Sequence, residues 1–280
     1  MRPKIALVLG GGGSRGIAHL GVLEVLVREN IPIDFIVGTS MGSIVGGLFA
    51  LGHAPADIAD GMRQLARNSI IRSLTTRARY RRIHGYLTQY INEQTFADLN
   101  IPMVAMAVDM VDGEEVILRD GPLLPALLAS SAVPGAFPPV RYRGMQLADG
   151  GVIDSVATHV AYQEQVDKII AVDVYPPLNT KTPWIDPVAA ITGVQLPGNI
   201  LGAGNDDNRI PSTPASIWRS IRIMTYHLHK QRLKNHPPDI LLRPSVDNYG
   251  SLDFKDVEGP RQAGFDEAER CLTELKSLIQ

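Results

Sequence analysis

The segment Val37–Ser43, which reads VGTSMGS, places Ser40 between two glycines, Gly38 and Gly42, directly after a short apolar run. Gly-x-Ser-x-Gly is the pattern of a nucleophile elbow, in which a serine on a sharp strand-to-helix turn exposes its hydroxyl in a cleft. Glycines suit such a turn because neighbouring backbones approach too closely for a Cβ. The same pattern also occurs in ordinary turns, so Ser40 is a candidate nucleophile whose partners must come from elsewhere.

A second segment that could take part in catalysis is the glycine-rich run Gly10–Gly16, GGGGSRG, which follows the apolar run Lys4–Leu9. Consecutive glycines leave backbone N–H groups free to converge on an anion, and a helix that follows adds its positive end. Such donors stabilise the oxyanion that forms when a serine attacks an ester. The segment therefore acquires a catalytic meaning if it lies beside Ser40.

The glycine-rich run also fits the dinucleotide fingerprint Gly-x-Gly-x-x-Gly at Gly11, Gly13 and Gly16. A nucleotide-binding oxidoreductase of this kind needs an acidic residue at the tip of the second strand to hold the ribose. Asp34 is in range, but it begins the second apolar run rather than ending it. This alternative is therefore weaker than the oxyanion hole, although it stays open at this point.

A serine nucleophile needs a proton acceptor. Among the seven histidines, none is flanked by a catalytic motif, and His236 is the best candidate for an ordinary triad. Asp149 has a more suggestive setting, since it follows the short strand-like run MQLA and precedes Gly150 and Gly151. An Asp-Gly pair is also a common plain turn, so both an aspartate and a histidine base remain candidates.

The elements that would position these residues follow from hydrophobic patterning. Apolar runs predict strands at residues 4–9, 32–38, 103–108, 114–119, 145–148, 168–174 and 239–244, and helical patterns cover residues 17–28, 43–51, 122–131, 216–233 and 261–278. The early alternation of strand and helix predicts a parallel sheet with right-handed crossovers. The carboxyl ends of parallel strands share one edge, so the glycine-rich run and Ser40 should be neighbours.

Bulk composition limits the function classes. The chain has 280 residues and a formal net charge of −2, which argues against a nucleic-acid binder. The single cysteine, Cys271, excludes an internal disulfide, and its helical setting predicts a packing residue. Neither an export signal nor a membrane-spanning run is visible, so we expect a cytoplasmic protein. The run Arg72–Arg82 carries five arginines and no acid, which indicates either a solvated face or a patch for anionic lipid headgroups.

These segments together resemble the patatin-like phospholipase family in its compact bacterial form. The similarity rests on LVLGGGGSRGIAHLGVLEVL, GTSMGS, ASSAVPGAFPPV and DGG, with weaker likeness at HPPDILLRP and NYGSLDF. The resemblance implies a three-layer α/β/α fold with a mainly parallel sheet, no cofactor or metal, and a Ser-Asp dyad without histidine. It makes Ser40 the nucleophile and Asp149 the base, and the motif positions around them are Gly11, Gly12 and Gly13 as the oxyanion hole, with Arg15, Gly16, Gly38, Gly42, Gly150 and Gly151 as support.

The implied function is a serine acyl hydrolase that cleaves fatty-acyl esters of lipids, in one domain over residues 1–280. The Pro- and Gly-rich segment at residues 176–216 is expected to be a long loop or cap. Arg72–Arg82 is a candidate peripheral membrane contact, with a solvated face as the alternative. A catalytically idle lipid-binding protein of the same fold is a further alternative. One departure concerns DGGVIDSVATHVA, where Ser155 and Ala157 stand near the places at which family members usually carry Asn and Pro.

Overall fold

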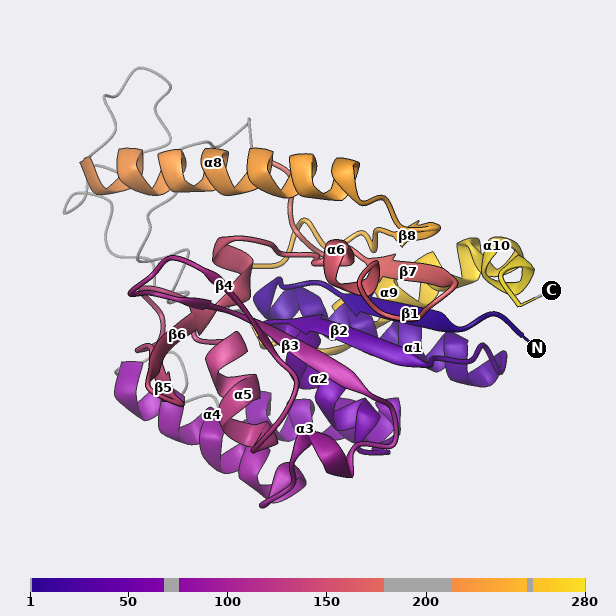
Figure 1. Cartoon of the computed structure of the whole chain (residues 1–280), viewed down its shortest axis with the longest axis horizontal. Coiled ribbons are helices and arrows are strands. Elements are labelled where there is room, and N and C mark those ends of the chain that lie inside the picture. The colour runs from indigo at the N-terminus through magenta and orange to yellow at the C-terminus, as the bar shows by residue number, and fades with distance from the viewer. Residues whose placement is uncertain (1, 68–75, 179–212, 251–253, 280) are drawn as a thin grey trace.

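The computed structural model describes residues 2–67, 76–178, 213–250 and 254–279. Its centre is an eight-stranded sheet with the order β5-β6-β3-β2-β1-β7-β8, and β4 pairs with β3 (Figure 1). The strands are β1 (Ile5–Leu9), β2 (Phe35–Thr39), β3 (Met103–Asp109), β4 (Glu115–Leu118), β5 (Val140–Tyr142), β6 (Met145–Asp149), β7 (Lys168–Val172) and β8 (Ile240–Leu242).

The described helices cover both faces of this sheet. They are α1 (Ala18–Arg28), α2 (Met41–Ala50), α3 (Pro55–Arg67), α4 (Thr76–Ile91), α5 (Leu123–Ser130), α6 (Thr158–Ala161), α8 (Thr213–Asn235), α9 (Glu258–Arg270) and α10 (Leu272–Ser277), with short 3₁₀ turns η1 (Gly13–Ile17), η3 (Phe96–Asp98) and η4 (Gly150–Val152). In Figure 1, α2, α3, α4 and α5 lie below the sheet, and α6 and α8 lie above it.

Strand β1 explains why the sheet has two unequal cores. All five of its residues are fully buried, and successive side chains point to opposite faces. Leu7 packs in the larger core, together with α1, α2, α5 and α9. Val8 packs in the smaller core, with α6 and Leu233 near the end of α8. The continuous apolar run therefore behaves as a strand covered on both faces, as parallel strands usually are.

The mainly parallel, three-layer α/β/α arrangement is confirmed. Strands β3, β2, β1, β7 and β8 are parallel neighbours, whereas β4, β5 and β6 join in antiparallel fashion on the β3 side. The short strand β5 and the helices α3 and α4 are not among the predicted elements. The predicted helix over residues 261–278 is in fact two helices that meet at Cys271, which is buried and free as expected of a packing residue.

Two sequence expectations fall largely outside the described residues. Of the expected loop at 176–216, residues 179–212 are not described. Of the run Arg72–Arg82, only the arginine side chain at Arg81 is described, and it is exposed. No helix in the described part of the chain combines the length and the apolar character needed to cross a membrane.

Candidate active site

Ser40 occupies a strained turn between β2 and α2. Its φ of 54° and ψ of −123° lie in a region that non-glycine residues rarely adopt, and such a conformation costs about 1–3 kcal/mol. The surroundings hold it in place, because the Ser40 N–H donates to the Ser130 hydroxyl at 3.0 Å, and its carbonyl accepts from the Ser43 N–H at 2.9 Å. The segment is thus a strand-to-helix elbow, as the Gly-x-Ser-x-Gly spacing predicts.

The glycines of the elbow are required by close packing. A Cβ on Gly42 would overlap the Leu9 carbonyl oxygen, and a Cβ on Gly38 would lie 2.5 Å from the Ser43 Cα. These contacts press the first turn of α2 against the end of β1, from which the glycine-rich run begins. The expectation that the two segments are neighbours is therefore confirmed.

Strand β3 brings the acid to the elbow. At Met106, β3 pairs with β2 on one edge and with β4 on the other. At Ala107, β4 still occupies its edge, so β6 pairs with the edge that β2 occupies one residue earlier. Strand β6 is antiparallel to β3 and therefore runs toward the end of β2. Thr39, the last residue of β2, lies opposite Met106, and Asp149, the last residue of β6, lies opposite Ala107. The two strand ends meet, and Ser40 follows immediately.

Asp149 is a buried carboxylate whose neighbours are neutral. Its side chain accepts from the Gly151 N–H at 2.7 Å, and the Ser40 side chain is close enough to stabilise its charge. Burial raises the pKa of Asp149 to about 6, although Ser40 and the hydrogen bond from Gly151 oppose that rise. The group is ionised at neutral pH and is a stronger base than an exposed aspartate, which suits it to accept a proton from a hydroxyl.

The glycine-rich run is fixed by the loop that follows Asp149. The Gly11 N–H donates to the Ser155 carbonyl at 2.8 Å, and the Ser155 hydroxyl donates to the Gly11 carbonyl at 3.3 Å. A Cβ on Gly11 would lie 3.2 Å from the Ser40 Cβ, so the run packs directly against Ser40. Within the described ranges, the N–H groups of Gly12 and Gly13 have no intramolecular acceptor.

His19 supports the same run from inside the protein. It is fully buried, and its Nε2 lies 2.7 Å from the Gly10 carbonyl oxygen. Burial lowers the pKa of His19 to about 4, so the ring is neutral at pH 7 and its Nε2–H donates to that carbonyl. Sequence reasoning placed His19 in a helix without a role. The signal that could have found it is its position at the start of the helix that follows the glycines.

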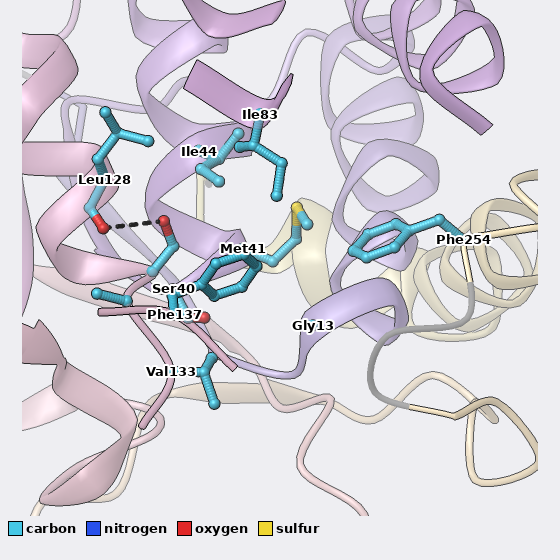
Figure 2. Close-up of a pocket in the computed structure, with 11 residues that line it drawn as sticks. Gly13, Ser40, Met41, Ile44, Ile83, Leu128, Val133, Phe137 and Phe254 are labelled. Atoms are coloured by element: carbon cyan, nitrogen blue, oxygen red, sulfur yellow. Dashed lines mark hydrogen bonds between the residues drawn. The ribbon is translucent and has the colours of Figure 1, made fainter. Parts of the chain in front are cut away.

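An apolar pocket opens beside Ser40 (Figure 2). Ser40 and Gly13 lie at its wall, and most of the remaining lining is aliphatic or aromatic: Met41, Ile44, Ile83, Leu128, Ala132, Val133, Phe137 and Phe254, with Ser131 as a further polar member. Val133 and Phe137 come from the ASSAVPGAFPPV segment, which explains why that segment accompanies the elbow. A pocket of this character binds a hydrocarbon chain through burial of apolar surface.

Other candidates from the sequence have different surroundings. Asp34 accepts from the Ile5 N–H at 2.8 Å and pairs with Arg2, at the end of β1 and β2 opposite the glycine-rich run. It is therefore not placed to hold a ribose beside that run. The ring of His236 packs against His159 and Tyr162.

Arg15, expected to support the glycine-rich run, lies in η1. Burial, with the nearby positive charge of Arg222, lowers the pKa of Arg15 to about 10, so it remains a cation at neutral pH. The Arg15 N–H donates to the Gly12 carbonyl at 3.3 Å. This backbone contact links the residue to the glycine-rich run.

Three side chains that could ligate a metal lie together in a second polar cluster. They are Glu115, Asp154 and His159. The guanidinium of Arg232 already contacts both carboxylates, at 3.0 Å from Glu115 and 3.4 Å from Asp154. The group is therefore a charge-compensated network that joins β4, the loop after Asp149, α6 and α8.

Comparison with known proteins agrees with this geometry. Residues 7–162 match the profile of a family described as "Patatin-like phospholipase". Lysophospholipase NTE1 from Meyerozyma guilliermondii is 28% identical over 285 residues, which cover 98% of this chain and 19% of that protein. The uncharacterized NTE family protein Rv1063c from Mycobacterium tuberculosis is 35% identical over 176 residues, covering 61% of this chain and 49% of that protein.

The solved structure of VipD from Legionella pneumophila shares the fold. It superimposes with a TM-score of 0.53 at 13% identity, covering 98% of this chain and 67% of VipD. This chain spans about a fifth of the length of the fungal lysophospholipases that it matches. The family profile covers more than half of the chain and includes both Ser40 and Asp149, and on this evidence the chain belongs to the patatin-like phospholipase family.

Proposed function

We propose that this chain is a serine acyl hydrolase that cleaves fatty-acyl esters of lipids with Ser40 and Asp149 as its dyad. The observation that carries the proposal is the proximity of the strained Ser40 to the buried Asp149, close enough for the Ser40 side chain to lower the pKa of that carboxyl against the effect of burial. An apolar pocket begins at the same serine. A nucleophile, a base and a hydrocarbon site in contact with one another are what ester hydrolysis of a lipid requires.

In the first step, Asp149 accepts the Ser40 hydroxyl proton while the Ser40 Oγ attacks the ester carbonyl carbon. The carbonyl oxygen becomes an oxyanion, which the N–H groups of Gly12 and Gly13 stabilise. The Gly11 N–H already donates to the Ser155 carbonyl, so Gly11 packs against Ser40 but does not donate to the oxyanion. As the tetrahedral intermediate collapses, Asp149 returns the proton to the departing alcohol oxygen.

In the second step, water attacks the Ser40 acyl ester. Asp149 accepts a proton from the water, a second oxyanion forms at the same glycines, and its collapse releases the fatty acid while the proton returns to the Ser40 Oγ. The same carboxylate therefore acts twice as base and twice as acid. Because its pKa is raised to about 6, Asp149 can both accept and return a proton near neutral pH more readily than an ordinary aspartate.

Single-chain lipids are the favoured substrate class. The lining residues are suited to an acyl chain, and relatives that align over almost the whole chain are named lysophospholipases. We expect a lysophospholipid to be hydrolysed faster than a diacyl phospholipid. A panel with matched acyl chains on lysophospholipid, diacyl phospholipid and p-nitrophenyl esters measures this preference.

The central test is labelling of the full chain with a fluorophosphonate probe, followed by peptide mapping. The probe should modify Ser40, and Ser40→Ala should abolish both labelling and hydrolysis. Ser277→Ala is the control, since Ser277 lies at the end of α10 and its hydroxyl bonds only the Glu274 carbonyl among the described residues. Wild-type protein that neither labels nor hydrolyses any lipid would instead support an idle lipid-binding protein.

Residues 1–280 are proposed to act as one hydrolase domain, with residues 176–216 as a loop or cap and Arg72–Arg82 as a peripheral membrane contact. The continuous sheet supports a single unit, and five arginines without an acid support attraction to anionic lipid. Binding to anionic vesicles should weaken as salt rises and when Arg81 and its neighbouring arginines become glutamine. Salt-independent binding, or none, would contradict the contact.

A further inference from the structure

Ser155 holds two consecutive peptide groups of the glycine-rich run. Its carbonyl accepts the Gly11 N–H at 2.8 Å, and its hydroxyl donates to the Gly11 carbonyl at 3.3 Å. Ser155 is buried, with 4% of its surface exposed. One residue therefore constrains the peptide on each side of Gly11, and Gly11 is the glycine that packs against Ser40.

Because the peptide bond is planar, this contact also fixes the direction of the Gly12 N–H. The described residues contain no cis peptide, and in a trans peptide the C=O and the N–H point in opposite directions. The Gly11 carbonyl points to the Ser155 hydroxyl, so the N–H of Gly12 in the same peptide points away from it. That N–H has no acceptor among the described residues, and the next residue, Gly13, lines the pocket with Ser40.

The preceding peptide is held just as firmly. Its carbonyl, on Gly10, accepts from His19 at 2.7 Å, and its N–H, on Gly11, donates to Ser155. Neither end of that peptide can rotate without breaking a buried hydrogen bond, which costs about 1–3 kcal/mol. Among the residues that the structure describes, the Gly11–Gly12 peptide has one comparable restraint, the Ser155 hydroxyl.

We propose that Ser155 is a positioning residue for the acyl-transfer reaction, because its hydroxyl orients the Gly11–Gly12 peptide and thereby presents the Gly12 N–H to the oxyanion. The inference rests on the proposed hydrolase function. It also predicts when Ser155 matters. As charge develops on the substrate oxygen, the Gly12 N–H donates more strongly, the Gly11 carbonyl becomes more negative, and the hydrogen bond from Ser155 strengthens with it. The contribution therefore appears in the transition state rather than in substrate binding.

The test compares Ser155→Ala with Ser155→Thr in the full chain, using p-nitrophenyl butyrate and a lysophospholipid. Ser155→Ala should lower kcat by at least about tenfold with KM changed by less than about twofold, because a lost transition-state hydrogen bond leaves ground-state binding intact. Ser155→Thr keeps the hydroxyl and should restore kcat to within about threefold of wild type. The inhibition constant of a trifluoromethyl ketone, which forms a tetrahedral adduct, should rise in Ser155→Ala by the same factor by which kcat falls.

An unchanged kcat in Ser155→Ala would overturn the proposal. So would a loss of kcat that moves the apparent pKa of the pH profile, since Ser155 would then act through Asp149. Should Ser155→Ala fail to fold, Ser155→Cys takes its place, because a thiol is a much poorer donor than a hydroxyl. It should lower kcat selectively, and a kcat equal to that of wild type would overturn the proposal. The proposed function is tested separately, by comparing the activity of wild type with that of Ser40→Ala before Ser155 is altered. Failure of that comparison would refute the hydrolase function, whereas failure of the Ser155 variants would refute only this inference.

Discussion

Asp149 and Asp154 are buried to nearly the same extent, with 5% and 2% of their surface exposed, and they are five positions apart. Each accepts a hydrogen bond from the N–H two residues ahead, at Gly151 and at Val156, but their side-chain neighbours differ. Asp149 faces neutral donors, the Ser40 side chain and the Gly151 N–H. Asp154 faces cations, with His159 at 3.2 Å and the guanidinium of Arg232 nearby.

This difference teaches that burial alone does not decide what a carboxylate does. Where the neighbours are neutral, burial penalises the charge and raises the pKa, which leaves Asp149 with a proton affinity useful for catalysis. Where the neighbours are cations, the negative charge is compensated, and the carboxylate stabilises the fold by holding those cations. Hydrogen bonds to Asp154 and Glu115 raise the pKa of His159 to about 9, so His159 is a cation at pH 7. The same substitution at the two aspartates should therefore have opposite consequences.

The largest expected effect is on activity in Asp149→Asn. The amide has nearly the same shape but cannot accept the Ser40 proton, so we expect kcat/KM to fall by about 10³–10⁴-fold, as in other serine hydrolases that lose a member of the catalytic set. The free energy of unfolding should stay the same or increase, because an uncompensated buried charge is removed. Ester hydrolysis and urea unfolding measure the two quantities. Activity within tenfold of wild type would exclude Asp149 as the base.

Asp154→Asn should show the reverse pattern. The amide oxygen can still accept from the Val156 N–H, as the carboxylate does at 3.0 Å, but the charge that balances His159 and Arg232 is lost. Removing one member of a buried ion pair typically costs about 3–5 kcal/mol, and we expect the lower end here because Glu115 still contacts both cations. Activity per folded molecule should remain within about tenfold. Equal unfolding midpoints for the two Asn variants would contradict the comparison.

The sequence predicts the local parts of this site and misses the parts formed between distant segments. The elbow at Ser40 and the turn at Asp149 each have a short pattern of their own, so both could be identified as candidates. The contact of Ser155 with Gly11 joins residues 144 positions apart, and that of Ser130 with the Ser40 N–H joins residues 90 apart. A single sequence has no spacing that specifies such pairs. The sequence analysis also missed α3, although its buried residues Ile58, Ala59 and Met62 have the helical spacing that identifies an amphipathic helix.

The third prediction concerns the pH dependence of stability. The folded pKa of His159, about 9, lies above its ordinary value near 6.5. The network therefore contributes its full stability below about pH 6.5 and loses it as the pH rises through 9. The loss should be at most about 3 kcal/mol, and less where solvent screens the network. Urea unfolding of wild type between pH 6 and 9.5 should show this fall, and His159→Gln should flatten it. A slope that persists in His159→Gln would assign the effect to another group.

The smallest expected effect is on the pH profile of activity, and it tests the other half of the comparison. Asp149 must be ionised to accept the Ser40 proton, and its pKa is raised to about 6. Below that pH, kcat/KM should fall about tenfold per unit, and above it the profile should be flat. A histidine base would titrate in a similar range, so the profile of His236→Gln serves as the control and should superimpose on that of wild type. A profile that is flat down to pH 4.5 would mean that the carboxylate keeps an ordinary pKa, and that burial among neutral donors does not give Asp149 the proton affinity that distinguishes it from Asp154.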